Sequence, residues 1–388
     1  MTTASAATAE HGTPHTRTHS PAQAHYSLPV FWPLELMTAL GQEGFKTVMR
    51  GFDTATEALK LNVGLEAKFA TPNRILLELN TMRLRDFSVE GETSTEIPTL
   101  IDAPFAGHPS TIADYTKGQS LVETMMANGL RRVYVTDWRS ATLDMKDYNI
   151  DHYLAELNVV VDELGGQVNL VGLCQGGWMV AMYAARYPAK VRSLVLAGSP
   201  IDTNAGHGPI REMAHKMKMS DFQRLVRLGG GLMLGRFMLA AWKNMHPEQH
   251  YFRKYVDLFE NINDPAYVHK EEAFEAWYEN PINLPGRWYL QAVEQLFKEN
   301  RLAKGTFVGL GKRLSLGDIH CPVTLLAGES DDITTKEQVF DADKYLGTPA
   351  SDIVKLLVPG GHIGLFMGSH TLRDTWPGIA QWIARVSA

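Results

Sequence analysis

An apolar run that ends in a cysteine flanked by glycines constrains the fold of this chain more than any other feature. Residues 168–178 read Val-Asn-Leu-Val-Gly-Leu-Cys-Gln-Gly-Gly-Trp, and a helix-like run follows them. A strand, a sharp turn and a helix in this order form a nucleophile elbow, which lifts a reactive side chain clear of a sheet. Because side chains two residues before and after the nucleophile would collide, glycine is needed at Gly172 and Gly176. The motif predicts Cys174 as the nucleophile.

Strands and helices alternate on both sides of this elbow. The expected elements are a strand pair or one long strand at 76–89, strands at 99–104, 132–136, 191–197, 323–327 and 353–358, and helices at 112–128, 150–163 and 376–386. Short buried strands that alternate with helices imply a mainly parallel, doubly wound sheet. We therefore expect an α/β protein with the α/β-hydrolase fold.

The strand pattern disappears between residues 203 and 299. Helical stretches rich in methionine and aromatic residues replace it, as expected for a helical cap inserted between two strands of the sheet. Most of these side chains are expected to form the core of the cap, and a few to line an apolar substrate channel. The expected division is a disordered tail at 1–28, an N-terminal helical region at 29–72, the α/β-hydrolase core at 73–202 and 301–388, and the cap at 203–300.

Composition argues against several classes of function. The chain has 388 residues, of which 45% are hydrophobic and 21% charged, as in ordinary globular proteins. Its net charge of −6 gives no basic surface for nucleic acid. Two cysteines cannot form a disulfide framework, no apolar run approaches the roughly 18 residues of a membrane span, and no signal peptide is recognisable. The low cysteine count favours a cytoplasmic protein. We expect no metal site, since no cluster of metal ligands occurs outside the tail.

An elbow nucleophile needs an acid and a base that follow it in the chain. Asp331 follows one expected core strand, and His362 follows the last one in a Gly-Gly-His-Ile-Gly segment. We predict that His362 takes the thiol proton and that Asp331 fixes the tautomer of the imidazole and stabilises its charged form. Asp331 is preferred to the adjacent Asp332 because it stands two residues before the apolar Ile333.

Two backbone N–H groups are expected to stabilise the oxyanion formed in the reaction. One is the N–H of Gln175, at the start of the helix after the elbow. The second should come from the loop after the strand at 99–104, near Phe105 and Ala106. His108, in the same loop, could contact the substrate or shape the loop.

These motifs resemble those of the polyhydroxyalkanoate synthase and intracellular polyhydroxyalkanoate depolymerase group of the α/β-hydrolase superfamily. The resemblance runs from about residue 98 to the C-terminus. The elbow segment 172–177 and the segment 359–364 around His362 look like those of the synthases, in which the elbow cysteine carries the growing chain. Other segments are more similar to the depolymerases, namely 103–108, 133–138, 198–202 and 328–333.

The chain departs from both sides of this group. Synthases tend to carry a histidine at the position of Asp332. Depolymerases tend to lack the double glycine that this chain has at Gly176-Gly177. Attack by Cys174 on an oxoester must expel an alkoxide, which is a poorer leaving group than a thiolate and needs protonation by His362. A coenzyme A thioester exchanges one thiolate for another, so this chemistry favours a synthase or a depolymerase that transfers its acyl group to coenzyme A.

The resemblance leads to three possible functions, and the loop segments that are more similar to depolymerases decide which one comes first. The first is an intracellular poly(3-hydroxybutyrate) depolymerase with an acyl-Cys174 intermediate. The alternative is a polyhydroxyalkanoate synthase, or its catalytic subunit, that uses hydroxyacyl-coenzyme A, and the third is a non-catalytic granule-surface protein. No cofactor is expected beyond coenzyme A as acyl donor or acceptor. The expected partner is a polyester granule or a hydroxyacyl substrate. The sequence does not decide between a homo-oligomer and assembly with a partner subunit.

Overall fold

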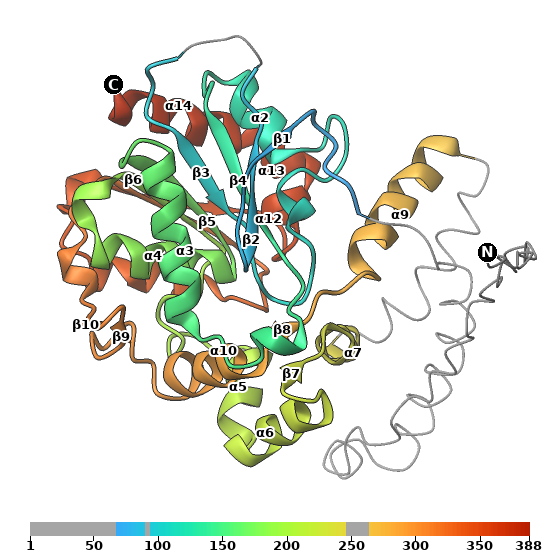
Figure 1. Ribbon diagram of the computed structural model, residues 1–388. Coiled ribbons are helices and arrows are strands. Elements are labelled where there is room, and N and C mark those ends of the chain that lie inside the picture. The colour runs from blue at the N-terminus through green and yellow to red at the C-terminus, as the bar shows by residue number, and fades with distance from the viewer. Residues whose placement is uncertain (1–66, 90–93, 246–263) are drawn as a thin grey trace, which may run out of the picture. The chain divides into compact units, whose positions relative to one another are not determined.

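The apolar runs on both sides of the elbow pair into one mostly parallel sheet (Figure 1). The computed structural model describes residues 67–89, 94–245 and 264–388, and in this part of the chain eight strands share the sheet in the order β1-β2-β4-β3-β5-β6-β11-β12. The strands are β1 (Arg74–Glu78), β2 (Met82–Asp86), β3 (Thr99–Asp102), β4 (Val133–Trp138), β5 (Val168–Leu173), β6 (Val191–Ala197), β11 (Val323–Gly328) and β12 (Ile353–Val358). The pairs β1–β2 and β2–β4 are antiparallel and the others are parallel. This is the α/β-hydrolase fold, which confirms the expectation from the sequence.

Helices cover the central strands because those strands are apolar on both faces. Every residue of β5 and β11 is buried, as is typical of parallel strands that lie between layers of helices. The helices are α2 (Leu121–Ala127), α3 (Ile150–Glu163), α4 (Gln175–Arg186), α5 (Pro209–Lys216), α6 (Met219–Leu228), α7 (Gly235–Met245), α9 (Pro265–Tyr278), α10 (Gly286–Gln291), α11 (Lys336–Phe340), α12 (Gly364–Met367), α13 (Ser369–Asp374) and α14 (Trp376–Ser387). Helix α4 packs on β5, β6 and α3, whereas α14 packs on β6 and α2.

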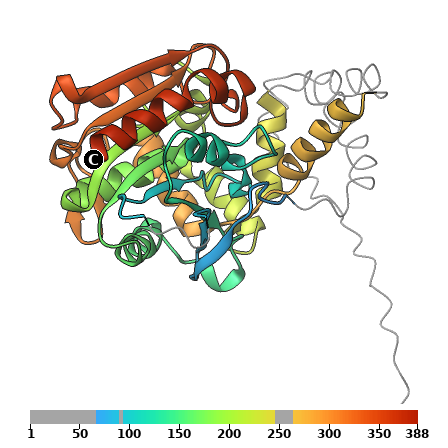
Figure 2. The same cartoon turned by 90° about the horizontal axis from the view of Figure 1, so that it is seen from above.

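The chain between β6 and β11 carries a helical insertion, as the change of pattern predicts. It contains the helices from α5 to α10, and we call its residues 203–300 the cap. A short strand pair, β7 (Leu232–Met233) with β8 (Leu284–Pro285), lies within it, and β9 (Val308–Gly309) pairs with β10 (Lys312–Arg313) after it. The end of α7 lies near the end of α9 (Figure 2), where Lys243 in α7 forms a largely buried ion pair of 2.6 Å with Glu279, just after α9.

The cap is hydrogen-bonded to the loop that follows β3. The Ile282 N–H donates to the Gly107 carbonyl at 2.9 Å, and the Trp277 indole N–H donates to the Pro109 carbonyl at the same distance. These bonds set the end of α9 against a loop that, in this fold, borders the nucleophile.

The helix predicted at 112–128 is wrong at its start, because α2 begins only at Leu121. Ser120 caps it, accepting a hydrogen bond from the Glu123 N–H at 2.9 Å. The buried Asp114 carboxylate in turn accepts from the Ser120 hydroxyl and from the Thr71 N–H, so the preceding residues are held in a loop. The Ser120 contacts are local and the Thr71 contact links distant segments, and together they override the helical pattern before Leu121.

The tail predicted at 1–28 lies outside the described residues, as does most of the helical region predicted at 29–72. The last residues of that region, 67–72, are described and form no helix, since Ala70 and Thr71 are hydrogen-bonded to Asp114. Among the helices that the structure describes, none combines the length and the apolar character needed to cross a membrane.

Candidate active site

The turn between β5 and α4 consists of Cys174 alone. β5 ends at Leu173 and α4 begins at Gln175. Cys174 has φ 51° and ψ −119°, a conformation that residues with a side chain rarely adopt. Its N–H donates to the Ala197 carbonyl at 2.8 Å, which ties the turn to β6. The strained turn presents a partly exposed cysteine at the carboxyl edge of the sheet, as an elbow should.

Three glycines allow the backbone to come this close. A Cβ at Gly172 would collide with the backbone of Gly177. A Cβ at Gly176 would collide with the Asp102 carbonyl, at the end of β3. A Cβ at Gly177 would collide with the side chain of Ser199, which follows β6. The steric reason predicted for Gly172 and Gly176 is confirmed, and Gly177 adds a third position that needs glycine.

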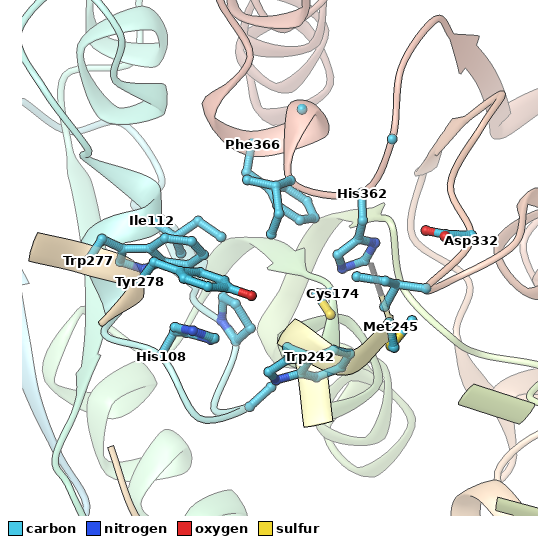
Figure 3. Close-up of a pocket in the computed structure, with 16 residues that line it drawn as sticks. His108, Ile112, Cys174, Trp242, Met245, Trp277, Tyr278, Asp332, His362 and Phe366 are labelled. Atoms are coloured by element: carbon cyan, nitrogen blue, oxygen red, sulfur yellow. The ribbon is translucent and has the colours of Figure 1, made fainter. Parts of the chain in front are cut away.

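Asp331 and His362 meet beside the elbow, in the loops after β11 and β12. The Asp331 Oδ2 and the His362 Nδ1 are 2.7 Å apart, and both side chains are buried. The other carboxylate oxygen of Asp331 accepts hydrogen bonds from the N–H groups of Ile333 and Thr334, at 3.0 and 2.8 Å. The fixed carboxylate makes Nδ1 the donor of the imidazole, so Nε2 faces Cys174 (Figure 3).

His362 is held in its charged form by its two neighbours. Burial of the ring opposes protonation, but the electrostatic interactions of the ring with Cys174 and Asp331 and its hydrogen bond to Asp331 outweigh this cost. The pKa of His362 is therefore raised well above its ordinary value of 6.5. A charged imidazole stabilises the thiolate, the form in which a cysteine is a nucleophile.

The neighbouring carboxylate, Asp332, takes a different place. It lines the cavity next to Cys174, whereas the hydrogen bond to His362 belongs to Asp331. The geometry thus favours Asp331 for the role of the acid, as the spacing to Ile333 predicts.

The two predicted sources of the second oxyanion donor differ in the structure. The Phe105 N–H donates to the Gln175 Oε1 at 2.5 Å, so it is already engaged and the prediction is wrong for Phe105. Ala106 borders the cavities at Cys174, and within the described residues its N–H makes no hydrogen bond. The N–H of Gln175 lies in the first turn of α4, where helical N–H groups have no partner within the helix. Gln175 and Ala106 therefore fit the two donors.

The side chain of Gln175 has a structural role that the sequence did not indicate. It is buried, and it joins the residue after the nucleophile to the loop after β3. The bond spans seventy positions of the chain, and nothing in the local pattern around Gln175 points to it.

Two cavities meet at Cys174. The larger, of about 330 Å³, lies between the loop after β3, the end of α9 and the segment around His362 (Figure 3). The smaller, of about 170 Å³, reaches into the cap, and most of its lining is methionine, aromatic or aliphatic, including Met213, Phe222, Met233, Met238, Trp288 and Phe297. Cys174, Ala106 and Trp242 border both cavities. The expected apolar channel of the cap therefore has a counterpart in the structure.

His108 lies in the larger cavity, next to the end of α9. Its ring stacks on Trp277 and Tyr278, with ring centroids 4.7 and 5.0 Å apart. No local sequence pattern pairs this loop residue with the cap, since the contacts span about 170 positions of the chain. In the part of the chain that is described, no group of histidine, cysteine and carboxylate side chains is arranged to hold a metal ion.

Proteins of known sequence or structure resemble this chain over most of its length. The family model described as "Protein of unknown function (DUF3141)" matches residues 82–383. The chain is 28% identical over 369 residues to the "Poly(3-hydroxyalkanoate) polymerase subunit PhaC" of Haloferax mediterranei, covering 92% of this chain and 73% of that one. A protein of the same name from Allochromatium vinosum is 26% identical over 345 residues, covering 86% and 93%. Among solved structures, a monoacylglycerol lipase of Paleococcus ferrophilus is similar with a TM-score of 0.49 and 17% identity, over 79% of this chain and 100% of that one.

The curated relatives and the strand order together support an enzyme with the α/β-hydrolase fold. They also confirm the resemblance to the polyhydroxyalkanoate synthase group that the motifs around Cys174 and His362 indicate.

Proposed function

The chain belongs to the family described as "Protein of unknown function (DUF3141)", and we propose that it is a cysteine-dependent acyltransferase of the polyhydroxyalkanoate synthase type. In this proposal a 3-hydroxyacyl group passes from coenzyme A to Cys174 and then to the hydroxyl end of a growing polyester. The observation that carries the proposal is a thiol nucleophile beside a buried imidazole–carboxylate pair, where an apolar cavity opens. The names of the curated relatives support this alternative over the depolymerase that the loop segments favour.

A cysteine nucleophile suits a thioester substrate. When Cys174 attacks the thioester carbon, the intermediate can expel either of two thiolates of similar leaving ability. Attack on a polymer oxoester would instead have to expel an alkoxide, the poorer leaving group, against return of the Cys174 thiolate. The raised pKa of His362 supports the same preference, because a charged imidazole can protonate the departing sulfur of coenzyme A.

The proposed cycle has two steps and regenerates the starting state. The Cys174 thiolate attacks the thioester carbonyl, the N–H groups of Gln175 and Ala106 hold the oxyanion, and coenzyme A leaves as a thiol with the proton from His362. The hydroxyl of the polymer end then gives its proton to the neutral His362 and attacks the acyl-Cys174. Its oxygen forms the new ester bond, and Cys174 leaves as the thiolate beside the charged His362.

The smaller cavity suits the acyl side chain. At about 170 Å³ it is similar to apolar protein cavities of about 150 Å³, which stay dry and bind ligands the size of benzene. We place the alkyl substituent of the hydroxyacyl group there, beside Cys174. A cytoplasmic location at the surface of polyester granules belongs to the same proposal.

The loop after β3 favours a second candidate, a depolymerase that uses the same acyl-Cys174 intermediate. Ala106 and His108 belong to the segment that is more similar to depolymerases, and both border the larger cavity. In that direction a polymer ester would acylate Cys174, and water or coenzyme A would release the acyl group.

Separate incubations with 3-hydroxybutyryl-coenzyme A and with amorphous poly(3-hydroxybutyrate) distinguish these functions. The second incubation is run with and without coenzyme A, and mass spectrometry follows polymer, soluble acid and acyl-coenzyme A. We expect polymer to grow from the thioester. Release of acid or acyl-coenzyme A from polymer, without growth, would establish the depolymerase instead.

Two cysteine variants control this experiment. Cys174→Ala should abolish growth, while Cys321→Ala should retain it, since burial raises the pKa of the Cys321 thiol to about 12 and makes it unreactive. If both variants and the unchanged protein were inactive, and granule binding survived in Cys174→Ala, the non-catalytic granule protein would replace both candidates.

A further inference from the structure

His108 has no task in the acyl transfer described above, although it lies in the same cavity as Cys174 and His362. Figure 3 shows its ring with Trp277 and Tyr278 on one side of the cavity and His362 on the other. The residue keeps some exposed surface, but its Nε2 atom is buried and makes no hydrogen bond in the described part of the chain. An unpaired polar atom at such a place is costly unless a ligand satisfies it.

The contacts of the ring show which kind of group Nε2 can bind. A hydrogen bond to the Tyr278 backbone raises the affinity of the ring for protons, so the imidazole donates it to the carbonyl. Nδ1 is the donor, because Nε2 has no partner. Burial, with a smaller effect of the nearby Lys243 charge, outweighs this bond and lowers the pKa of His108 to about 4. The neutral ring therefore offers Nε2 as an acceptor.

The ligand group that fits is a neutral hydrogen-bond donor. An ammonium group is disfavoured by the positive charge of Lys243, which already lowers the pKa of His108. A carboxylate or a carbonyl has no proton to donate. A hydroxyl fits, and it can also accept a hydrogen bond, for which the cavity offers the buried Trp242 Nε1–H, another group with no partner among the described residues.

We infer that His108 accepts a hydrogen bond from the 3-hydroxyl group of the acyl substrate and so selects 3-hydroxyacyl thioesters over unsubstituted ones. The inference rests on the proposed function, which supplies a substrate with one hydroxyl close to the reacting carbonyl. His108 is a specificity residue in this account, since the low basicity of its ring leaves the proton transfers to His362. Sites built to bind a substrate hydroxyl discriminate strongly against analogues that lack it.

The test compares acylation of Cys174 by 3-hydroxybutyryl-coenzyme A and by butyryl-coenzyme A. Release of coenzyme A gives kcat/KM for each thioester, and intact-protein mass spectrometry identifies the adduct. His108→Phe keeps an aromatic ring between Trp277 and Tyr278 but removes the acceptor. We expect it to lower the preference for the hydroxylated thioester by on the order of ten- to a hundred-fold. His108→Gln, which has an acceptor oxygen, should recover part of that preference.

The ratio of the two kcat/KM values separates recognition from a structural role. If His108 only shaped the loop, His108→Phe would slow both thioesters alike and leave the ratio unchanged, which would overturn the inference. Calorimetric binding of the same two thioesters to Cys174→Ala protein provides a readout without turnover, and equal affinities would also overturn it. If the unchanged protein were acylated by both thioesters at equal rates, the inference about His108 would fail while the proposed function would stay intact. Acylation by neither would refute that function, and the inference with it.

Discussion

The side chains proposed to react and the side chains that surround them come from two differently built regions. Cys174, Asp331 and His362 each follow a strand of the sheet, so the hydrogen bonds between parallel strands bring them together. Trp242, and the Trp277–Tyr278 pair that stacks on His108, belong to the cap, which is an insertion between two of those strands. In the proposed function, the sheet therefore positions the reacting groups, whereas the cap lines the space that would receive the acyl group.

The largest effect should follow a change at the sheet edge, Asp331→Asn. An amide cannot fix the imidazole tautomer as the carboxylate does, so we expect kcat to fall by on the order of 10⁴. Release of coenzyme A from 3-hydroxybutyryl-coenzyme A measures the loss, and Asp332→Asn is the matched control with a far smaller expected effect. Equal losses in the two variants would show that the hydrogen bond between Asp331 and His362 does not carry the role assigned to it.

A smaller effect, on stability, should follow Gly176→Ala. The new Cβ would press against the Asp102 carbonyl in the packed centre of the sheet, which should cost on the order of 3 kcal/mol of unfolding free energy. Gly378→Ala in α14, where the added Cβ meets open space, should instead stabilise the protein by about 0.5–1 kcal/mol. Urea unfolding measures both, and a neutral Gly176→Ala would mean that the elbow can open to accept a side chain at this position.

His108 and His362 should make the free energy of unfolding depend on pH in opposite directions. The pKa of His108 is lowered to about 4, chiefly by burial, so between pH 6.5 and 4 the unfolded chain binds a proton that the folded chain does not. Stability should fall as the pH falls through this range, by on the order of 3 kcal/mol in total. The pKa of His362 is raised, so its contribution is complete below about pH 6.5 and is lost as the pH rises through the folded-state pKa.

Urea unfolding at pH 4.5 and pH 7 tests the contribution of His108. His108→Phe should lose less stability at the lower pH than the unchanged protein does, because the group that must be kept neutral has been removed. The same loss in both proteins would mean that the ring is not buried in its neutral form under the cap.

The smallest expected effect belongs to the cap, in Met213→Ala. Removing this partly exposed side chain enlarges the apolar cavity without touching the sheet. The ratio of kcat/KM for 3-hydroxyoctanoyl- over 3-hydroxybutyryl-coenzyme A should rise by about tenfold, in the range that one or a few methylenes can supply. A fall in both kcat/KM values with no change in their ratio would contradict the claim that the cap lines the space for the acyl group.

The sequence predicted the sheet well because each core strand leaves a local pattern. The elements at 150–163, 191–197 and 353–358 have the predicted bounds, and the positions of Asp331 and His362 follow from the loops that must meet at one edge of a parallel sheet. The need for glycine on both sides of Cys174 could be predicted from the elbow motif, although only the clash at Gly172, with Gly177, is local, and the clash at Gly176 is with Asp102 on a neighbouring strand.

The parts that failed depend on contacts between distant segments. The loop before α2 is tied by Asp114 to the distant Thr71, in addition to the local cap at Ser120, and the loss of Phe105 as an oxyanion donor is caused by the side chain of Gln175. The stacking of His108 on the end of α9 has the same origin. A single sequence shows which residues favour a helix or strand, but not which distant side chain takes a given N–H group.

The most direct test of the central claim is the intact mass of the protein after brief exposure to 3-hydroxybutyryl-coenzyme A. The account predicts one hydroxyacyl adduct per chain, located on Cys174 by peptide mapping, present in Cys321→Ala and absent in Cys174→Ala. No adduct on any residue, or an equal amount of adduct in Cys174→Ala, would contradict the assignment of Cys174 as the acyl carrier.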